Sequence, residues 1–166
     1  RITDVIHIYA NIRKEIPSKL LLVGDGPERP MAEELSRELE ICDDVRFVGK
    51  QQDMEEIYVI SDLFLLPSEY ESFGLAALEA MAGGAPVVSS NAGGLPEIII
   101  PGKNGYMSNV GDVEGMSKQA ISILKDDKTL ASFKANAQAQ SLRFDISSIV
   151  PQYEELYEKV IAGVPA

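Results

Sequence analysis

A regular alternation of short apolar runs with longer segments of helical period limits what this chain can fold into. Each apolar run is rich in Leu, Val or Phe and is too short for a buried helix. We predict strands at 19–24, 45–49, 62–67, 85–90 and 104–109. We predict helices at 29–40, 53–61, 74–84, 112–125, 127–142 and 146–161, and the first residues also look helical. Strands that alternate with helices predict an α/β fold, in which helices cover both faces of a parallel sheet.

The predicted C-terminal helices carry their own local signals. Asp112, Asp127 and Asp145 stand where three of them begin, as N-caps or first-turn acids. The last helix, 146–161, has an apolar stripe. We expect this stripe to dock either on the sheet of this chain or on a further domain.

Composition allows one domain and excludes several classes of partner. The 166 residues are 45% hydrophobic, enough for a single folded domain over residues 1–166. The net charge of −11 opposes binding to nucleic acid or anionic lipid. No apolar stretch approaches the roughly 20 residues of a membrane span, and the start lacks a signal-peptide pattern. The chain begins with Arg1 rather than Met, and we expect it to be a fragment of a longer protein.

The chain has one cysteine, Cys42, and one histidine, His7. A single cysteine excludes an internal disulfide and a thiolate metal cluster, and it fits a reducing cytoplasm. A Ser–His–Asp relay would need His7, which is far from the candidate site loops. We expect His7 to be a partly exposed helix residue and Cys42 to pack beside a turn. No Asp-x-Asp element occurs, so we expect neither a metal ion nor another cofactor.

In a doubly wound sheet, ligands bind beyond the carboxyl ends of the strands. The stretch YESFGLAALEA, which begins at Tyr70, follows one such end. The open amides of the helix that begins near Gly74 would form an anion site, and the glycine would let a ligand approach closely. Glu79 could accept bonds from vicinal hydroxyls such as those of a ribose, with Glu71 near the other end of the ligand. This pattern fits a nucleotide-sugar site, but Glu71 as a helix cap and Glu79 as a solvated side chain fit it equally.

Three other glycine-containing loops follow strands. The first holds Gly24 and Gly26 but has Arg29 where a dinucleotide fingerprint needs its third glycine, so it is either a plain turn or a contact with a nucleotide. The second, 91–105, holds a glycine pair that either exposes amides to a ligand or makes a turn. The third holds Lys50, which is either a contact to a base or a surface charge.

Taken together, these loops resemble the retaining glycosyltransferases of family 4, also called group 1. The resemblance rests on Glu71-SFGLAAL-Glu79, EAMAGGAPVVSS and AGGLPEII, and on LLLVGDGP and VRFVGKQQDM in the same order. It covers essentially the whole chain. It implies the C-terminal, Rossmann-like half of a GT-B fold, the half that holds a nucleotide-sugar donor.

The resemblance also implies roles for individual residues. Glu71 would contact the hydroxyls of the donor sugar as the catalytic residue. The sugar and the diphosphate would be bound by Ser72, Phe73, Gly74, Leu75, Ala76, Gly24, Gly26, Gly93 and Gly94. The nucleoside would be bound by Glu79, Gly49, Lys50 and Gln51, with Glu79 on the ribose.

Within the family, LLLVGDGPE, FVGKQQD, SEYESFGLAALEAMA and YMSNVGDVEGMSKQAI most resemble enzymes of bacillithiol biosynthesis that transfer GlcNAc from UDP-GlcNAc to L-malate. The family places an Arg and a Lys after a first strand, and here both would lie before Arg1, together with an N-terminal acceptor domain. We therefore expect the fragment to bind donor weakly and to be inactive alone. Three alternatives stay open: a family member with another sugar, a non-catalytic nucleotide-binding module, and an NAD-linked oxidoreductase, which Arg29 disfavours.

Overall fold

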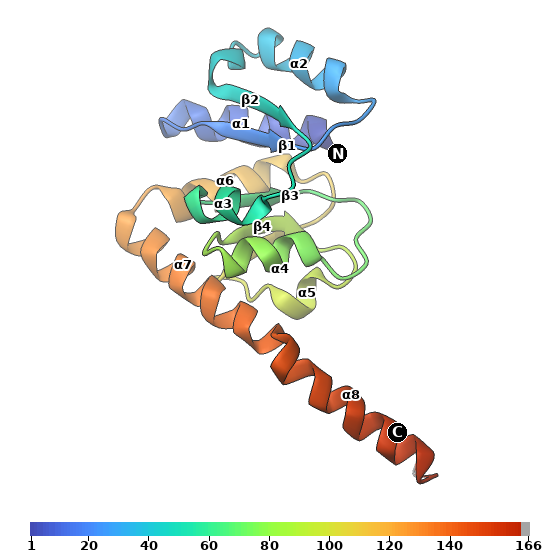
Figure 1. Ribbon diagram of the computed structural model, residues 1–166. Coiled ribbons are helices and arrows are strands. Elements are labelled where there is room, and N and C mark those ends of the chain that lie inside the picture. The colour runs from blue at the N-terminus through green and yellow to red at the C-terminus, as the bar shows by residue number, and fades with distance from the viewer. Residues whose placement is uncertain (164–166) are drawn as a thin grey trace.

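The computed structural model describes residues 1–163 and confirms the predicted alternation of strands and helices (Figure 1). The strands are β1 (Leu20–Val23), β2 (Val45–Gly49), β3 (Phe64–Leu66), β4 (Val87–Ser90) and β5 (Gly105–Ser108). The helices are α1 (Ile2–Glu15), α2 (Arg29–Glu38), α3 (Met54–Ile60), α4 (Leu75–Ala82), α5 (Leu95–Ile98), α6 (Val113–Leu124), α7 (Asp127–Ser141) and α8 (Ile146–Ile161). Two 3-10 turns, η1 (Cys42–Asp44) and η2 (Leu142–Phe144), complete the order. Helices flank the parallel strands, and the fold is a Rossmann-like α/β fold.

The strands form two parallel sheets rather than one continuous sheet. β1 pairs with β2, and β3, β4 and β5 pair in that order, with Leu65 opposite Val88 and Val88 opposite Tyr106. In Figure 1, β1 is the strand of its sheet that lies nearer to β3. Within residues 1–163, no ladder of hydrogen bonds joins these two strands. The facing edges of β1 and β3 therefore lack the strand neighbour that an interior position in a sheet would have.

Helix α1 packs against both sheets. Ile6 and Tyr9 belong to the apolar cluster that includes Val45 of β2. Ile8 and Ile12, on another side of the helix, belong to the cluster that includes Val88 of β4. One helix thus buries two apolar stripes and links the two sheets.

The residues of strand β4 are all apolar or small, because both faces of the strand are covered. Successive residues of a strand point to opposite faces of the sheet. Val87 packs with Ala77 and Met81 of α4, whereas Val88 packs with Met116 of α6 and with α1. Every residue of β4 is buried, as expected for a parallel strand covered on both faces.

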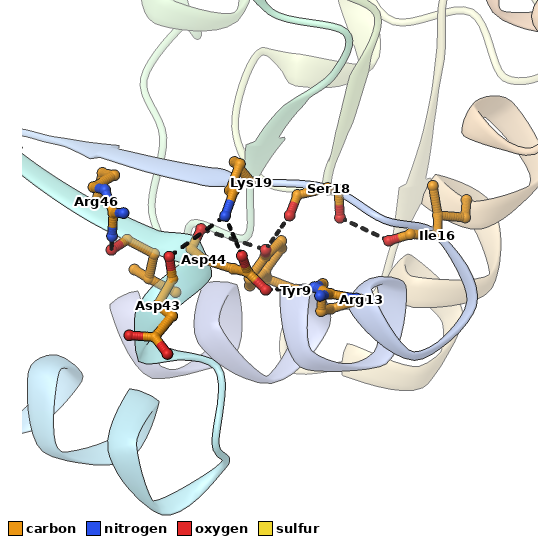
Figure 2. Close-up of polar contacts among 9 residues, drawn as sticks. Tyr9, Arg13, Ile16, Ser18, Lys19, Asp43, Asp44 and Arg46 are labelled. Carbon is orange, nitrogen blue, oxygen red and sulfur yellow. Dashed lines mark hydrogen bonds and ion pairs between the residues drawn. The ribbon is translucent and has the colours of Figure 1, made fainter.

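An ionic network ties α1 to the entry of β2 (Figure 2). Arg13 Nε lies 2.6 Å from Asp44 Oδ2, and Lys19 contacts the other oxygen of the same carboxylate. Hydrogen bonds from Lys19 and Arg13 lower the pKa of Asp44. The Tyr9 hydroxyl donates to the carbonyl oxygen of Ser18 at 2.7 Å. These contacts lie at the amino ends of β1 and β2, and so they stabilise the sheet away from its carboxyl edge.

The helix caps follow the predicted pattern. The carboxylates of Asp112 and Asp145 accept hydrogen bonds from the first turns of α6 and α8. Asp126 caps α7, and Asp127 is its first-turn acid. Docking of α8 on the sheet of this chain is not observed, because α8 extends away from the sheets and none of its residues is buried (Figure 1). The expectation that Cys42 packs beside a turn was wrong, because the side chain lies exposed on η1.

Candidate active site

The start of α4 has the properties of an anion-binding helix terminus. Gly74 is the N-cap residue, with φ +94°, and no side chain in residues 1–163 caps this helix. Aspartates occupy the amides that begin α6, α7 and α8, whereas over the same residues the starts of α1, α2, α3 and α5, like that of α4, have no side-chain cap. The amides of the first turn of α4 are therefore left without a side-chain acceptor, and together with the helix dipole they favour an anion there.

Gly74 is required by the fold itself. Its positive φ lies in the left-handed region, which side chains with a Cβ rarely adopt. In addition, a Cβ at this position would lie 2.6 Å from Cδ2 of Leu95 on α5. The glycine thus leaves room for the Leu95 side chain against the start of α4. Its proposed contact with a ligand stays a prediction.

The glycine pair after β4 packs directly on the loop after β3. Gly93 has φ +54°, and a Cβ there would lie 1.5 Å from the carbonyl oxygen of Glu71. The amide of Gly94 donates to the carbonyl oxygen of Ser72 at 3.0 Å. The Gly94 amide therefore already has a partner inside the protein, and the pair serves first to bring two loops together.

The two predicted carboxylates have different surroundings. Glu71 is half-buried, and within residues 1–163 no side chain is hydrogen-bonded or ion-paired to it. Glu79 lies on the exposed side of α4 and accepts a hydrogen bond from the Tyr58 hydroxyl, with 3.3 Å between the oxygen atoms. Burial, and then the negative charge of Glu79, raise the pKa of Tyr58 to about 12. Tyr58 is therefore a donor at neutral pH. No sequence motif predicts this contact, because Tyr58 and Glu79 are 21 positions apart.

The loops after β1 and β2 lie together. The amide of Gly24 donates to the carbonyl oxygen of Gly49 at 2.8 Å, and both glycines have positive φ. The amide of Gly26 is bonded to the Asp25 side chain. Lys50 is exposed, and the Gln51 side chain donates back to the carbonyl oxygen of Val48. In the described part of the chain, no hydrogen bond or ion pair joins Lys50 or Gln51 to the α4 terminus.

A polar cavity of about 500 Å³ connects the loop after β1 with the loop after β3. It is lined by Arg1, Thr3, Glu28, Ser68, Glu69 and Tyr70. The predicted site residues do not line it; it lies beside them along the same carboxyl edge. Arg1 Nε lies 2.6 Å from Asp4 Oδ2, and Nη1 lies 3.7 Å from Glu69. These flanking positions are not predicted by the sequence motifs, because their proximity depends on how the strands are ordered.

Residues 1–163 contain no helix that is both long and apolar enough to cross a membrane. Over the same residues, no group of three or more His, Cys, Asp or Glu side chains is arranged to hold a metal ion.

The chain is similar to several glycosyltransferases. It is 44% identical over 162 residues to the N-acetyl-alpha-D-glucosaminyl L-malate synthase of Bacillus anthracis, covering 97% of this chain and 42% of that protein. It is 33% identical over 171 residues to the D-inositol 3-phosphate glycosyltransferase of Corynebacterium kroppenstedtii, covering 97% of this chain and 38% of that protein. The chain thus spans less than half the length of these relatives.

Solved structures show the same relationship. The crystal structure of Anabaena Alr3699/HepE in complex with UDP superposes with a TM-score of 0.84 at 29% identity, covering 93% of this chain and 44% of that one. The C-terminal domain of a glycosyl transferase group 1 family protein, LpcC of Francisella tularensis, superposes with a TM-score of 0.78 at 25% identity. That match covers 87% of this chain and 79% of the other. The sequence profile of the family "Glycosyl transferases group 1" matches residues 1–140, and the chain belongs to that family.

Proposed function

We propose that this chain is the donor-binding domain of a retaining glycosyltransferase that uses a UDP-sugar. The observation that carries the proposal is the uncapped amino end of α4 at Gly74, flanked by Glu71 and Glu79. Amides that lack a side-chain acceptor suit a diphosphate, and carboxylates suit the hydroxyls of a sugar and a ribose. Membership of group 1 and the likeness to a UDP complex support this assignment.

In the complete enzyme, we propose transfer of GlcNAc from UDP-GlcNAc to L-malate. The 44% identity to a malate synthase supports these substrates. A group 1 transferase with another sugar or acceptor is the nearest alternative, because the acceptor would be chosen largely by a domain outside residues 1–166. A non-catalytic nucleotide-binding module would bind UDP but transfer no sugar.

We further propose that an N-terminal domain and one strand precede Arg1 in the complete protein. The unpaired edges of β1 and β3 support this arrangement. Arg1 lines a cavity with Glu28, from the loop after β1, and with Ser68, from the loop after β3. A strand that runs into α1 would therefore end between these two loops and could pair with both β1 and β3. The basic pair expected after that strand would face the diphosphate.

The chemistry would be substitution at the anomeric carbon with retention. The bond from that carbon to the β-phosphate oxygen breaks, and the acceptor hydroxyl oxygen bonds to the carbon on the same face. The hydroxyl proton passes to the departing phosphate, so no protein nucleophile is needed. The protein would supply positioning and stabilisation of the diphosphate by the amides that begin α4.

The test is a product assay with the full-length protein. UDP-GlcNAc and UDP-glucose are each offered with L-malate and with glycerol, and the product is identified by mass spectrometry. We expect GlcNAc-malate with the α configuration and no product when malate is omitted. If the protein used UDP-glucose and not UDP-GlcNAc, UDP-glucose would be the donor instead of the one proposed. Binding of UDP without any sugar transfer would favour the non-catalytic module.

Calorimetry with UDP tests the expected weakness of residues 1–166 alone. Two missing charge-assisted bonds, each about 1.5–3 kcal/mol, would cost roughly two to four powers of ten in affinity. Equal affinities of the domain and the full-length protein would refute the role of the upstream cations.

A further inference from the structure

The Tyr58 side chain is held rigidly between α3 and α4. It is the one buried residue of α3, with 5% of its surface exposed. Its ring lies edge-on to Phe64 of β3, with 5.8 Å between the ring centroids. Gly83 allows the close approach of the two helices, because a Cβ there would lie 2.6 Å from Cβ of Tyr58. The ring has little room to change rotamer.

The Tyr58 hydroxyl leaves this apolar cluster toward Glu79. It donates to Oε2 of Glu79 at 3.3 Å, and within residues 1–163 it is the only side chain hydrogen-bonded to that carboxylate. Glu79 is otherwise exposed, and a free Glu side chain samples many rotamers. The bond from a rigid ring restricts those rotamers. A carboxylate has about four acceptor positions, so the second oxygen stays open for other donors.

We infer that Tyr58 is a positioning residue that holds the Glu79 carboxylate ready to accept the ribose hydroxyls of the donor nucleotide. The inference rests on the proposed function, in which Glu79 binds the ribose. A carboxylate that is ordered before the ligand arrives does not have to be ordered during binding, and this raises affinity. Tyr58 itself touches no part of the donor in this account.

A purely structural role would explain the same contact differently. A buried hydroxyl needs a hydrogen-bond partner, and Glu79 is within reach. In that case, loss of the hydroxyl would change the stability of the protein and leave the affinity for nucleotide unaltered. Binding and stability therefore have to be measured on the same variants.

The experiment compares Tyr58→Phe with Tyr9→Phe in the full-length protein. Tyr9 is 3% exposed, and its hydroxyl is bonded to the Ser18 carbonyl, so Tyr9→Phe also removes one bonded hydroxyl from a buried ring. Calorimetry with UDP should show a dissociation constant raised about fivefold to tenfold by Tyr58→Phe and changed less than about twofold by Tyr9→Phe. In steady-state assays, KM for the donor should rise while kcat stays within about twofold.

Two further arms link the effect to Glu79 and to ribose. In a Glu79→Ala background, Tyr58→Phe should cause no additional loss of affinity. With 2′,3′-dideoxy-UDP as the probe, wild type and Tyr58→Phe should bind equally. Full UDP affinity in Tyr58→Phe, or a loss that persists beside Glu79→Ala or with the dideoxy probe, overturns the inference.

The same measurements separate this inference from the proposed function. If Glu79→Ala weakens UDP binding and Tyr58→Phe does not, only the positioning role fails. If wild type does not bind UDP, or if Glu79→Ala leaves affinity unchanged, the ribose role of Glu79 fails and the inference fails with it.

Discussion

The amide nitrogen of Gly94 lies 3.0 Å from the carbonyl oxygen of Ser72 and joins the loop after β4 to the loop after β3. Next to this bond, the α-carbon of Gly93 faces the carbonyl oxygen of Glu71 so closely that a side chain has no room. The glycine pair is thus part of what fixes the backbone that carries Glu71 to the start of α4.

Replacing Gly93 with Ala should displace the Glu71 loop. The new Cβ would lie 1.5 Å from a backbone oxygen, so the backbone must move. Gly102→Ala is the matched control, because its φ of +77° imposes similar strain while the nearest atom to a Cβ is 4.0 Å away. Unfolding in urea should show a loss of about 1–2 kcal/mol for Gly102→Ala and a clearly larger loss for Gly93→Ala. Equal losses would mean that the loop contact does not hold Glu71.

Glu71→Ala and Glu79→Ala should each lower kcat/KM of the full-length enzyme by at least about tenfold, which corresponds to about 1.4 kcal/mol of transition-state stabilisation. The reason is the proposed bonding of each carboxylate to hydroxyls of the donor. Glu34→Ala, on the exposed side of α2, is the control, because Glu34 only pairs with Arg37 of its own helix. A steady-state assay decides the matter, and wild-type rates in either variant would remove the role of that residue.

The Asp126 cap of α7 should make the stability of the protein fall at acidic pH. The hydroxyl and then the amide of Thr129 donate to Asp126 and lower its pKa below the ordinary value of 3.8. Because the folded state favours the charged form, this stabilisation is complete above pH 3.8 and is lost as pH falls through the lowered pKa. The advantage of wild type over Asp126→Ala in thermal unfolding should therefore shrink from about pH 7 to about pH 3.

Asp126→Asn provides the control for that experiment. An amide side chain can cap the helix but does not titrate in this range. Its difference from Asp126→Ala should stay constant between the two pH values. If the stability difference between wild type and Asp126→Ala were also the same at both pH values, the lowered pKa of Asp126 would not be the cause.

The raised pKa of Tyr58 should make the free energy of unfolding fall at alkaline pH. Its pKa of about 12 in the folded state exceeds the ordinary value of 10.0, because of burial and the neighbouring Glu79 charge. The folded state therefore keeps the proton that the unfolded chain releases, and the resulting stability is present below pH 10 and lost as pH rises toward 12. Denaturant unfolding between about pH 9 and pH 11 should show a steeper loss for wild type than for Tyr58→Phe. If wild type and Tyr58→Phe lost stability equally over this pH range, the Tyr58 hydroxyl would be exposed to solvent.

The amino-acid sequence by itself determined the five strands and most of the helices, and it placed the ends of the predicted elements within two residues of the observed ones. The spacing of apolar residues and the positions of Asp112 and Asp145 are local signals. They reflect side-chain periodicity and helix capping, which depend only on residues within one or two helical turns. The motif around Glu71 and Glu79 also identified the family, because several ordered segments occur together.

Only the tertiary structure decided which groups meet. Tyr58 and Glu79 are 21 positions apart, and Gly93 reaches Glu71 across an intervening helix and strand. The division of the strands into two sheets, with α1 packed on both, is likewise absent from any local pattern. Such contacts depend on strand order and on how closely two backbones can approach, and these are properties of the packed core rather than of neighbouring residues in the chain.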